Sequence, residues 1–420
     1  MGIIYLAGES DAPGLTVRGV RFLNADYLLL GVLLVLALAV SAWIGAQIQL
    51  PGRPVEKDEL TNWDYAIIPI GLIALFAYSI WFKDILFNPS VLIQVLTGAF
   101  KPERDEIGLT PGVTSLVNVA PAFHGIYALR SVDGSGVRRP RIVHVLFAML
   151  LSLTVFRVYV WSERLAMIEL LVPFGLAAGR WLMTCPGRTA SVLRTLGPFA
   201  ALPLIIMYFG AAEYARSWAS PTYNGKMSFW EFAVGRFASY YYTALNNGAG
   251  MLVILPNGTW EFEFLLEWFH KAPFGLGKPF SEYVGWTNSR FFWYLESFQD
   301  PEFNSPSAIY AVVADMGLYG GLGYFLLEGL ASGLAFRAYR SGSLPGALLF
   351  PICFISLLEI YRYSYLGQPR AFTWVLGMIL VFIFVMVIAA VRKARAAGRA
   401  TSSHRSWAPT VQTAPAGLGD

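Results

Sequence analysis

Nine apolar segments, each long enough to cross a lipid bilayer, recur along this chain. A transmembrane helix needs about 20 predominantly apolar residues. The segments lie at 26–47, 65–82, 112–130, 141–159, 164–181, 195–213, 307–337, 344–363 and 371–391. Only 14% of the residues are charged and 56% are hydrophobic, whereas about 25% of the residues in a soluble protein are charged. The sequence therefore predicts an all-α polytopic membrane protein whose surface is covered mostly by lipid.

A tenth apolar piece, at 90–100, is shorter and ends in a charged run. It is either a tenth span or a helix in the membrane interface, and we favour the interfacial helix. At the start of the chain, Met1 to Ala7 is too short for the apolar region of a cleavable signal peptide, and Asp11 and Pro13 end it. We therefore expect about nine to ten transmembrane helices, with the first acting as an uncleaved anchor.

The basic residues divide the loops into two classes, because cytoplasmic loops carry an excess of Lys and Arg. Four clusters fall in alternate loops: Arg138, Arg139 and Arg141; Arg180, Arg188 and Arg194; Arg337 and Arg340; Arg392, Lys393, Arg395 and Arg399. If all four are cytoplasmic, the loops at 159–163, 214–306 and 363–370 face outward. The side on which Met1 lies depends on the tenth segment and stays open.

The chain then divides into four parts. N-terminal transmembrane helices occupy 1–213 with about six spans, a large periplasmic loop occupies 214–306, and three C-terminal spans occupy 307–391. The remainder, 392–420, is expected to be a cytoplasmic disordered tail because it becomes rich in Ser, Thr, Pro, Ala and Gly.

The large loop is rich in aromatic residues, and a structureless loop of about 90 residues would be unusual. The run from Thr259 to Phe269 is typical of a short amphipathic helix that rests at the lipid headgroups. Its rings either anchor the protein in the interface or form a platform on which sugar rings stack. The sequence leaves both interpretations open.

Several classes of function are disfavoured. The net charge of +4 is small and no Lys/Arg run follows a nucleic-acid backbone. Cys185 and Cys353 are interpreted as packing residues, and the four histidines show no metal-ligand spacing. No phosphate-binding loop, dinucleotide fingerprint or internal repeat stands out. We expect no metal, no cofactor and no nucleic-acid partner.

Two arginines mark the outward turn between the spans at 141–159 and 164–181. Arg157 and Arg164 lie at or inside the two helix ends, where a buried guanidinium is unfavourable unless it is paired. Glu163 and Glu169 can pair with them internally. A phosphate-bearing ligand is the alternative, because a guanidinium meets phosphate oxygens bidentately.

A second polar stretch follows the sixth span. Arg236 and Tyr240 are one helical turn apart, and Thr243 and Asn247 continue the same stripe. Such a face suits a ligand rich in hydroxyl groups. It is also compatible with a helix face wetted by solvent.

A third stretch leads into the seventh span. Glu302 lies at the surface and Asp315 about two turns below it, and a lone aspartate at that depth indicates a functional site. Two pairs of glycines, Gly317 with Gly321 and Gly329 with Gly333, follow in this span and are expected to be helix-packing contacts.

Glu328 and Glu359 are acidic residues deeper in the membrane. They are expected to pair with arginines such as Arg362.

At these three stretches the sequence resembles the bacterial oligosaccharide repeat-unit polymerases, relatives of the O-antigen polymerases. The features that carry the resemblance are Arg157 with the Ser162-Glu163-Arg164 turn, the Arg236/Tyr240-Tyr241-Tyr242/Asn246-Asn247 stretch, and Glu302-Phe303-Asn304 leading into Asp315-Met316-Gly317. The match covers roughly residues 60–390 in layout, through short motifs.

The resemblance implies a fold related to the C-type glycosyltransferases and O-antigen ligases. It also implies a metal-independent transfer between polyprenyl-diphosphate-linked oligosaccharides at the periplasmic face of the bacterial inner membrane, beside a flippase and a chain-length regulator of the same pathway. Carried onto this sequence, the catalytic candidates are Glu302, Asp315 and Glu163. The substrate-binding candidates are Arg157, Arg164, Arg236, Tyr240, Tyr241, Asn246, Asn247 and Asn304. Two alternatives remain at this point, an O-antigen-type ligase and a flippase that transports the lipid-linked oligosaccharide.

Overall fold

The computed structural model describes residues 19–49, 56–100, 102, 108–133, 135–161, 163–214, 218, 228–255, 257–286 and 289–405. Within these residues the secondary structure is helical, apart from one isolated bridge between Gly19 and Gln299. The expectations for the chain start and for residues 406–420 lie outside the described residues.

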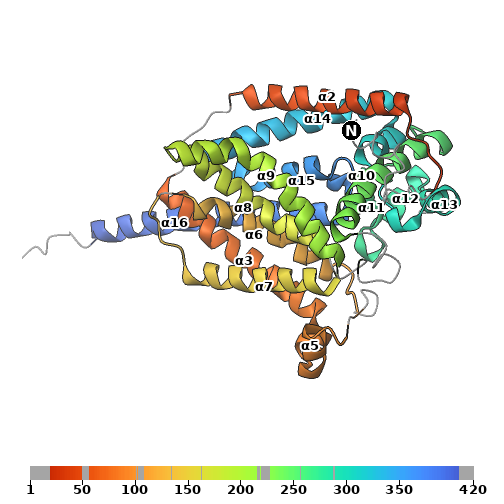
Figure 1. Cartoon of the computed structure of the whole chain (residues 1–420). Coiled ribbons are helices and arrows are strands. Elements are labelled where there is room, and N and C mark those ends of the chain that lie inside the picture. The colour runs from red at the N-terminus through yellow and green to blue at the C-terminus, as the bar shows by residue number, and fades with distance from the viewer. Residues whose placement is uncertain are drawn as a thin grey trace, which may run out of the picture.

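Six helices in the described part of the chain are long and apolar enough to cross a membrane (Figure 1). They are α2 (Ala25–Gln47), α3 (Lys57–Trp81), α7 (Arg141–Trp161), α8 (Arg164–Thr184), α14 (Ala308–Ser341) and the Pro369–Ala397 part of α16 (Pro369–Arg405). Each coincides with a segment expected from the sequence. The chain is therefore an all-α, multi-pass membrane protein.

The other three expected spans form helices that are not among those long and apolar enough to cross a membrane. Segment 112–130 is split into the 3-10 helix η1 (Thr114–Val119) and α6 (Ala120–Ser131), segment 195–213 belongs to α9 (Arg188–Glu213), and segment 344–363 gives α15 (Leu344–Glu359). Ten of the 12 residues of α6 are buried, so it lies inside the bundle and not against lipid. The tenth candidate forms α5 (Pro89–Leu96), whose eight residues are too short for a span.

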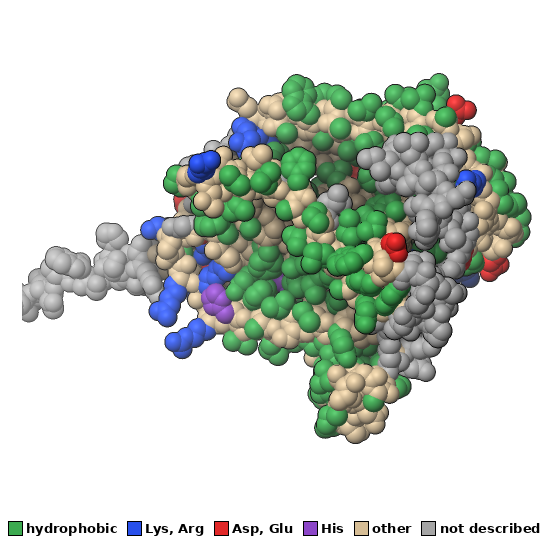
Figure 2. Space-filling view, viewed as in Figure 1, with side chains coloured by type: hydrophobic (Ala, Val, Ile, Leu, Met, Phe, Trp, Pro, Cys, Tyr) green, Lys and Arg blue, Asp and Glu red, His purple; other side chains and the backbone are tan. Residues whose placement is uncertain are grey.

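The basic clusters lie together at one end of the bundle. Arg180 in α8 donates hydrogen bonds to the carbonyl oxygens of Tyr339 and Arg340 at the end of α14. Arg130 in α6 pairs with Asp64 in α3, and Lys and Arg side chains gather at the left of the surface in Figure 2. We call this the basic end. This arrangement agrees with the alternation of charged loops in the sequence.

The chain enters the membrane at the opposite end. The side chain of Asn246 accepts hydrogen bonds from the backbone N–H groups of Phe22 and Leu23, just before α2. Helix α2 then runs beside α14, so that Tyr310 contacts Tyr27 and Gly333 contacts Gly45. Helix α2 thus begins at the end opposite to the basic end, while Met1, whose side the sequence left open, lies outside the described residues.

The segment expected as a large loop is a helical cap on this opposite end. It contains α10 (Phe229–Ile254), α11 (Glu267–His270), η3 (Pro273–Gly275), α12 (Lys278–Val284), α13 (Ser289–Phe298) and η4 (Pro301–Phe303). Most residues of α10 are buried, so its polar stripe is not wetted by solvent. The cap carries the candidate site.

Two local expectations for this region and the tail are corrected. The amphipathic helix expected over 259–269 does not form, because Trp260 and Phe262 adopt left-handed φ angles of 57° and 56°; only α11 is helical there. Helix α16 continues to Arg405, so the described part of the expected disordered tail is helical.

Candidate functional site

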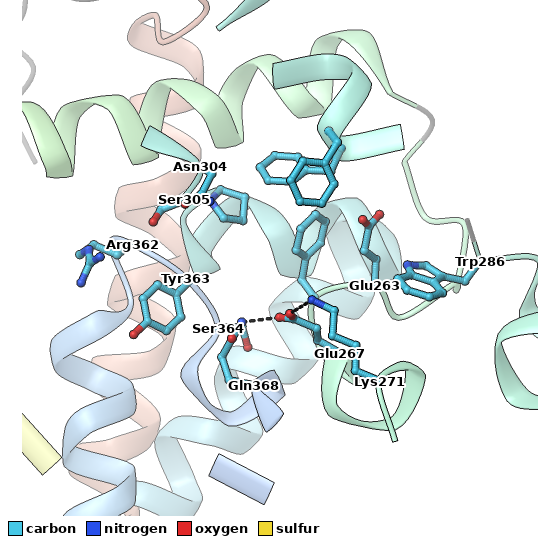
Figure 3. Close-up of a pocket in the computed structure, with 14 residues that line it drawn as sticks. Glu263, Glu267, Lys271, Trp286, Asn304, Ser305, Arg362, Tyr363, Ser364 and Gln368 are labelled. Atoms are coloured by element: carbon cyan, nitrogen blue, oxygen red, sulfur yellow. Dashed lines mark hydrogen bonds and ion pairs between the residues drawn. The ribbon is translucent and has the colours of Figure 1, made fainter. Parts of the chain in front are cut away.

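A cavity of about 320 Å³ lies in the cap, between segments that are far apart in the sequence. Asn304, Ser305 and Pro306 form part of its wall just before α14, and Arg362, Tyr363 and Ser364 contribute from the turn after α15. Glu263, Glu267, Lys271 and Trp286 face them from the cap (Figure 3). We call this the first cavity. Its lining combines carboxylates, cations, amides and aromatic rings.

A second cavity of about 520 Å³ adjoins the first. Glu267, Lys271 and Gln368 line both cavities and so form a shared wall. In this wall the ammonium of Lys271 lies 2.6 Å from a carboxylate oxygen of Glu267, and the amide of Gln368 donates to the other oxygen. Arg157, Glu163 and Arg370 line the far side of the second cavity.

The carboxylate of Glu163 is held between two arginines. Arg157 donates from Nε and Nη2 over 2.5 and 2.8 Å, and Arg370 donates from Nη2 over 2.5 Å. Arg370 also lies 3.4 Å from Glu169, whose carboxylate accepts a hydrogen bond from Tyr365. The internal pairing of Arg157 with Glu163 is therefore present, and charge-assisted bonds of this kind are strong. The network borders the second cavity with its polar atoms already matched.

Arg164 does not join that network. It lies 3.3 Å from Glu213, which also lies 3.4 Å from Arg236. The guanidinium of Arg164 stacks 4.7 Å from the ring centre of Tyr240, and that of Arg236 stacks 4.5 Å from Phe303. Glu213 is fully buried, so this cluster joins α8, α9 and α10 inside the protein. Tyr241 packs on Phe237 beside it.

The two asparagines of α10 are structural. Asn246 binds the backbone of residues 20–23 and the side chain of Gln299. Asn247 donates to the carbonyl oxygens of Phe303 and Ser305, at 2.6 and 3.3 Å. Both side chains are fully buried. They position the chain before α2 and the wall of the first cavity, and neither lines either cavity.

Asp315 holds the backbone of the cap. Its two carboxylate oxygens accept hydrogen bonds from the N–H groups of Glu263, Phe264 and Leu265, at 2.9–3.0 Å. It is 3% exposed and borders a space of only about 20 Å³, outside the first cavity. Asp315 therefore positions the segment that carries Glu263 and Glu267. The backbone of Glu302 belongs to η4, while its side chain lies outside the described residues.

Burial, together with the nearby carboxylates of Asp315 and Glu261, raises the pKa of the Glu263 carboxyl to about 8. This carboxyl therefore holds a proton at neutral pH. Arg362, across the first cavity, pairs with Glu359 at 2.8 Å, as expected from the sequence. Glu328, for which the same kind of partner was expected, instead accepts a hydrogen bond from Ser356 over 2.6 Å.

Of the catalytic and substrate-binding candidates named from the sequence, Arg157, Glu163 and Asn304 line the two cavities. The sequence-based argument missed Glu263, Glu267, Lys271, Gln368 and Arg370. A signal for two of them was present, because Glu261, Glu263 and Glu267 interrupt an aromatic run that was interpreted as an interfacial helix. Arg370 gave no such signal beyond lying in an outward loop.

The described residues contain no group of three or more metal-binding side chains. Comparisons with protein-family models, with curated proteins and with solved structures find no match. Function is therefore argued from the geometry of the two cavities and from the sequence motifs.

Proposed function

We propose that this chain is a glycosyltransferase that joins polyprenyl-diphosphate-linked oligosaccharide repeat units into a polysaccharide at the periplasmic face of the bacterial inner membrane. The observation that supports it best is the pair of adjoining polar cavities, which share the wall of Glu267, Lys271 and Gln368. A transfer between two large substrates needs two neighbouring sites and one place where they meet.

In this reaction a hydroxyl of the acceptor sugar attacks the anomeric carbon of the donor glycan. The new glycosidic C–O bond forms as the bond to the diphosphate breaks, and the diphosphate leaves with the electron pair. The proton of the acceptor hydroxyl passes to a carboxylate acting as general base. Arginines near the leaving group stabilise its charge, and Arg157 and Arg370 border the second cavity.

Glu267 is the carboxylate placed best to act as the base. It lines both cavities, whereas Asp315 lies outside them and Glu163 borders only the second. All three carboxylates have partners, since Glu267 is itself held by Lys271 and Gln368, so Glu267 is distinguished by its position. Glu163 then acts as a positioning residue that holds Arg157 and Arg370 at the cavity edge.

The test uses the purified full-length protein in proteoliposomes with a lipid-linked oligosaccharide and no nucleotide sugar. We expect a ladder of longer lipid-linked glycans, separated by gel electrophoresis, that persists in a chelator. A product that forms only after a lipid A-core acceptor is added would identify a ligase. Translocation of labelled lipid across the sealed bilayer, with no ladder, would identify a transporter and overturn the proposal.

A further inference from the structure

A third large cavity, of about 620 Å³, lies at the basic end of the bundle. Its wall is formed by the beginning of α3, the ends of α6, α8 and α14, and the turn after α6. Lys57, Arg130 and Arg180 line it together with Trp63 and Trp181. It is therefore on the opposite end of the molecule from the two cavities considered above.

In the part of the chain that the structure describes, only one of its three cations is paired with a carboxylate. Arg130 is matched by Asp64 at 2.8 Å and by Asp133. Within the described residues, no carboxylate lies within 4.0 Å of Lys57 or of Arg180. Asp133 is the acidic residue in the lining, so the three cations leave the cavity wall with an excess of positive charge. An anion is the ligand class that such a site attracts.

The guanidinium of Arg180 is held in place by the backbone. Its Nη1 atom donates to the carbonyl oxygens of Tyr339 and Arg340. Gly342 ends α14 with a φ of 78°, and a Cβ atom there would lie 2.5 Å from Nη2 of Arg180. The glycine thus makes room for the guanidinium. A fixed cation binds an anion with a smaller loss of side-chain entropy than a mobile one.

The position of the cavity indicates where the anion comes from. Trp181 is 51% exposed at the end of the membrane-spanning α8, and tryptophan prefers the level of the lipid headgroups. Leu60 and Leu129 supply apolar wall beside the cations. Basic pockets between transmembrane helices on the cytoplasmic side suit anionic headgroups. Basic residues that only set the orientation of the protein in the membrane need to lie in the loops. They need not come from two helices and line one cavity, as Lys57 and Arg180 do.

We propose that this cavity binds the phosphate group of an anionic phospholipid headgroup, held by Lys57 and Arg180. The site is independent of the glycosyl transfer proposed above. It links α3, α8 and α14 at the end where none of the three is covered by the cap. A bound lipid therefore stabilises the basic end of the bundle.

The test is native mass spectrometry of the purified full-length protein, titrated with phosphatidylglycerol, phosphatidylcholine or inorganic phosphate. We expect phosphatidylglycerol to bind in preference to phosphatidylcholine. Lys57→Ala should weaken it about fivefold, and the double variant with Arg180→Ala about 25-fold. The matched control is Lys393→Ala with Arg395→Ala, which removes the same charge from exposed positions of α16 and should leave the preference intact.

If the double variant fails to fold, the single variant Lys57→Ala still tests the proposal. It should fold normally, because the Lys57 side chain is exposed and forms no ion pair within the described residues. Equal weakening in the control pair would show unspecific attraction and overturn the proposal. Competition by inorganic phosphate at the concentration of the lipid would show a site for the free anion, and the headgroup assignment would be wrong.

Discussion

Glu267 lies in the wall shared by the first and second cavities. Replacing its carboxylate is therefore the most direct test of the proposed reaction. Its carboxylate contacts Lys271 at 2.6 Å and Gln368. Glu267→Gln keeps the size of the side chain but removes the base. We expect turnover to fall by about 10²–10⁴-fold, measured as the rate of ladder formation at normal expression.

Glu282→Gln is the matched control. Glu282 belongs to the same cap, is exposed, and forms only a surface pair with Lys278 at 3.6 Å, so its loss should leave the rate unchanged. If Glu267→Gln retained most of the activity, the base would have to be sought elsewhere.

The raised pKa of Glu263 predicts how the stability of the protein depends on pH. The pKa of this carboxyl is about 8 in the folded protein, and an ordinary Glu has a pKa of about 4.3 when unfolded. Between these values the unfolded chain releases a proton that the folded protein retains. The contribution of the Glu263 carboxyl to the free energy of unfolding is thus complete below pH 4 and is lost as the pH rises toward 8.

We therefore expect the apparent melting temperature to fall between pH 5 and pH 8, and Glu263→Gln to make that fall smaller. The measurement is a thermal unfolding series in detergent across this pH range. An unchanged slope in the variant would mean that Glu263 ionises normally in the fold.

At the scale of elements, α2 and α14 approach each other through glycine. A Cβ atom at Gly333 would lie 2.1 Å from the carbonyl oxygen of Ala42, and one at Gly329 would lie 2.1 Å from Oγ of Ser41. Small residues allow such contact between membrane helices. The expectation that Gly329 and Gly333 are packing contacts is therefore confirmed. For the other pair it is wrong: Gly321 faces Val313 of its own helix, and Gly317 forms the kink of α14 beside Gly258 of the cap.

Gly333→Val should separate α2 from α14 and lower the apparent melting temperature, because the added methyl groups clash with backbone that cannot move aside. Gly323→Val, on the same helix, has nothing within 4 Å of the added Cβ and serves as the control. Equal losses in both variants would point to helix propensity as the cause and not to the interface.

The cap segment from Asn257 to Leu266 depends on Asp315 at the kink of α14. Gly317 breaks the helix with a φ of 73° and a ψ of 175°, next to the carboxylate that accepts three backbone N–H groups. In Asp315→Asn one acceptor oxygen is replaced by a donor. We expect faster hydrogen exchange at residues 263–265, measured by mass spectrometry.

Glu328→Gln provides the comparison, since Glu328 lies on the same helix and accepts a hydrogen bond from Ser356 instead of from the cap. It should leave exchange at 263–265 unaltered. Normal exchange together with lost activity in Asp315→Asn would favour a catalytic role for Asp315 over the positioning role.

For the whole molecule, α14 is longer than the membrane is thick. The 24 residues after the kink at Gly317, 318–341, span about 36 Å, against a hydrocarbon core of about 30 Å. The first turns of α14 therefore enter the cap, and its end reaches the basic end. The first and second cavities are therefore separated from the cavity at the basic end by the full depth of the bilayer.

The orientation of the molecule can be tested in intact cells. In a chain with Cys185 and Cys353 replaced, a cysteine at Tyr283 should react with an impermeant thiol reagent and one at Arg395 should not. Tyr283 is 89% exposed in the cap, and Arg395 is exposed at the other end of the molecule. Labelling at 395 with protection at 283 would invert the assigned topology.

The sequence by itself determined the class of fold, because lipid imposes a local rule. Every span needs a continuous apolar stretch, and basic residues mark the loops of one side. This is why a span was predicted within each of α2, α3, α7, α8, α14 and α16, although α3 begins eight residues before its predicted segment and α16 continues beyond its own to Arg405. This local rule does not apply to α6 and α10, because both are enclosed by protein and need no lipid-facing surface.

Only the tertiary structure decided which polar groups meet. Gln368 contacts Glu267 across 101 residues, and Arg370 contacts Glu163 across 207 residues. No local pattern encodes such distant pairs. Arg164, expected near Glu163 or a ligand, instead pairs with Glu213 at the end of another helix. Buried charges need matching partners wherever the packing supplies them, and the packing of the cap on the membrane helices is a property of the whole chain.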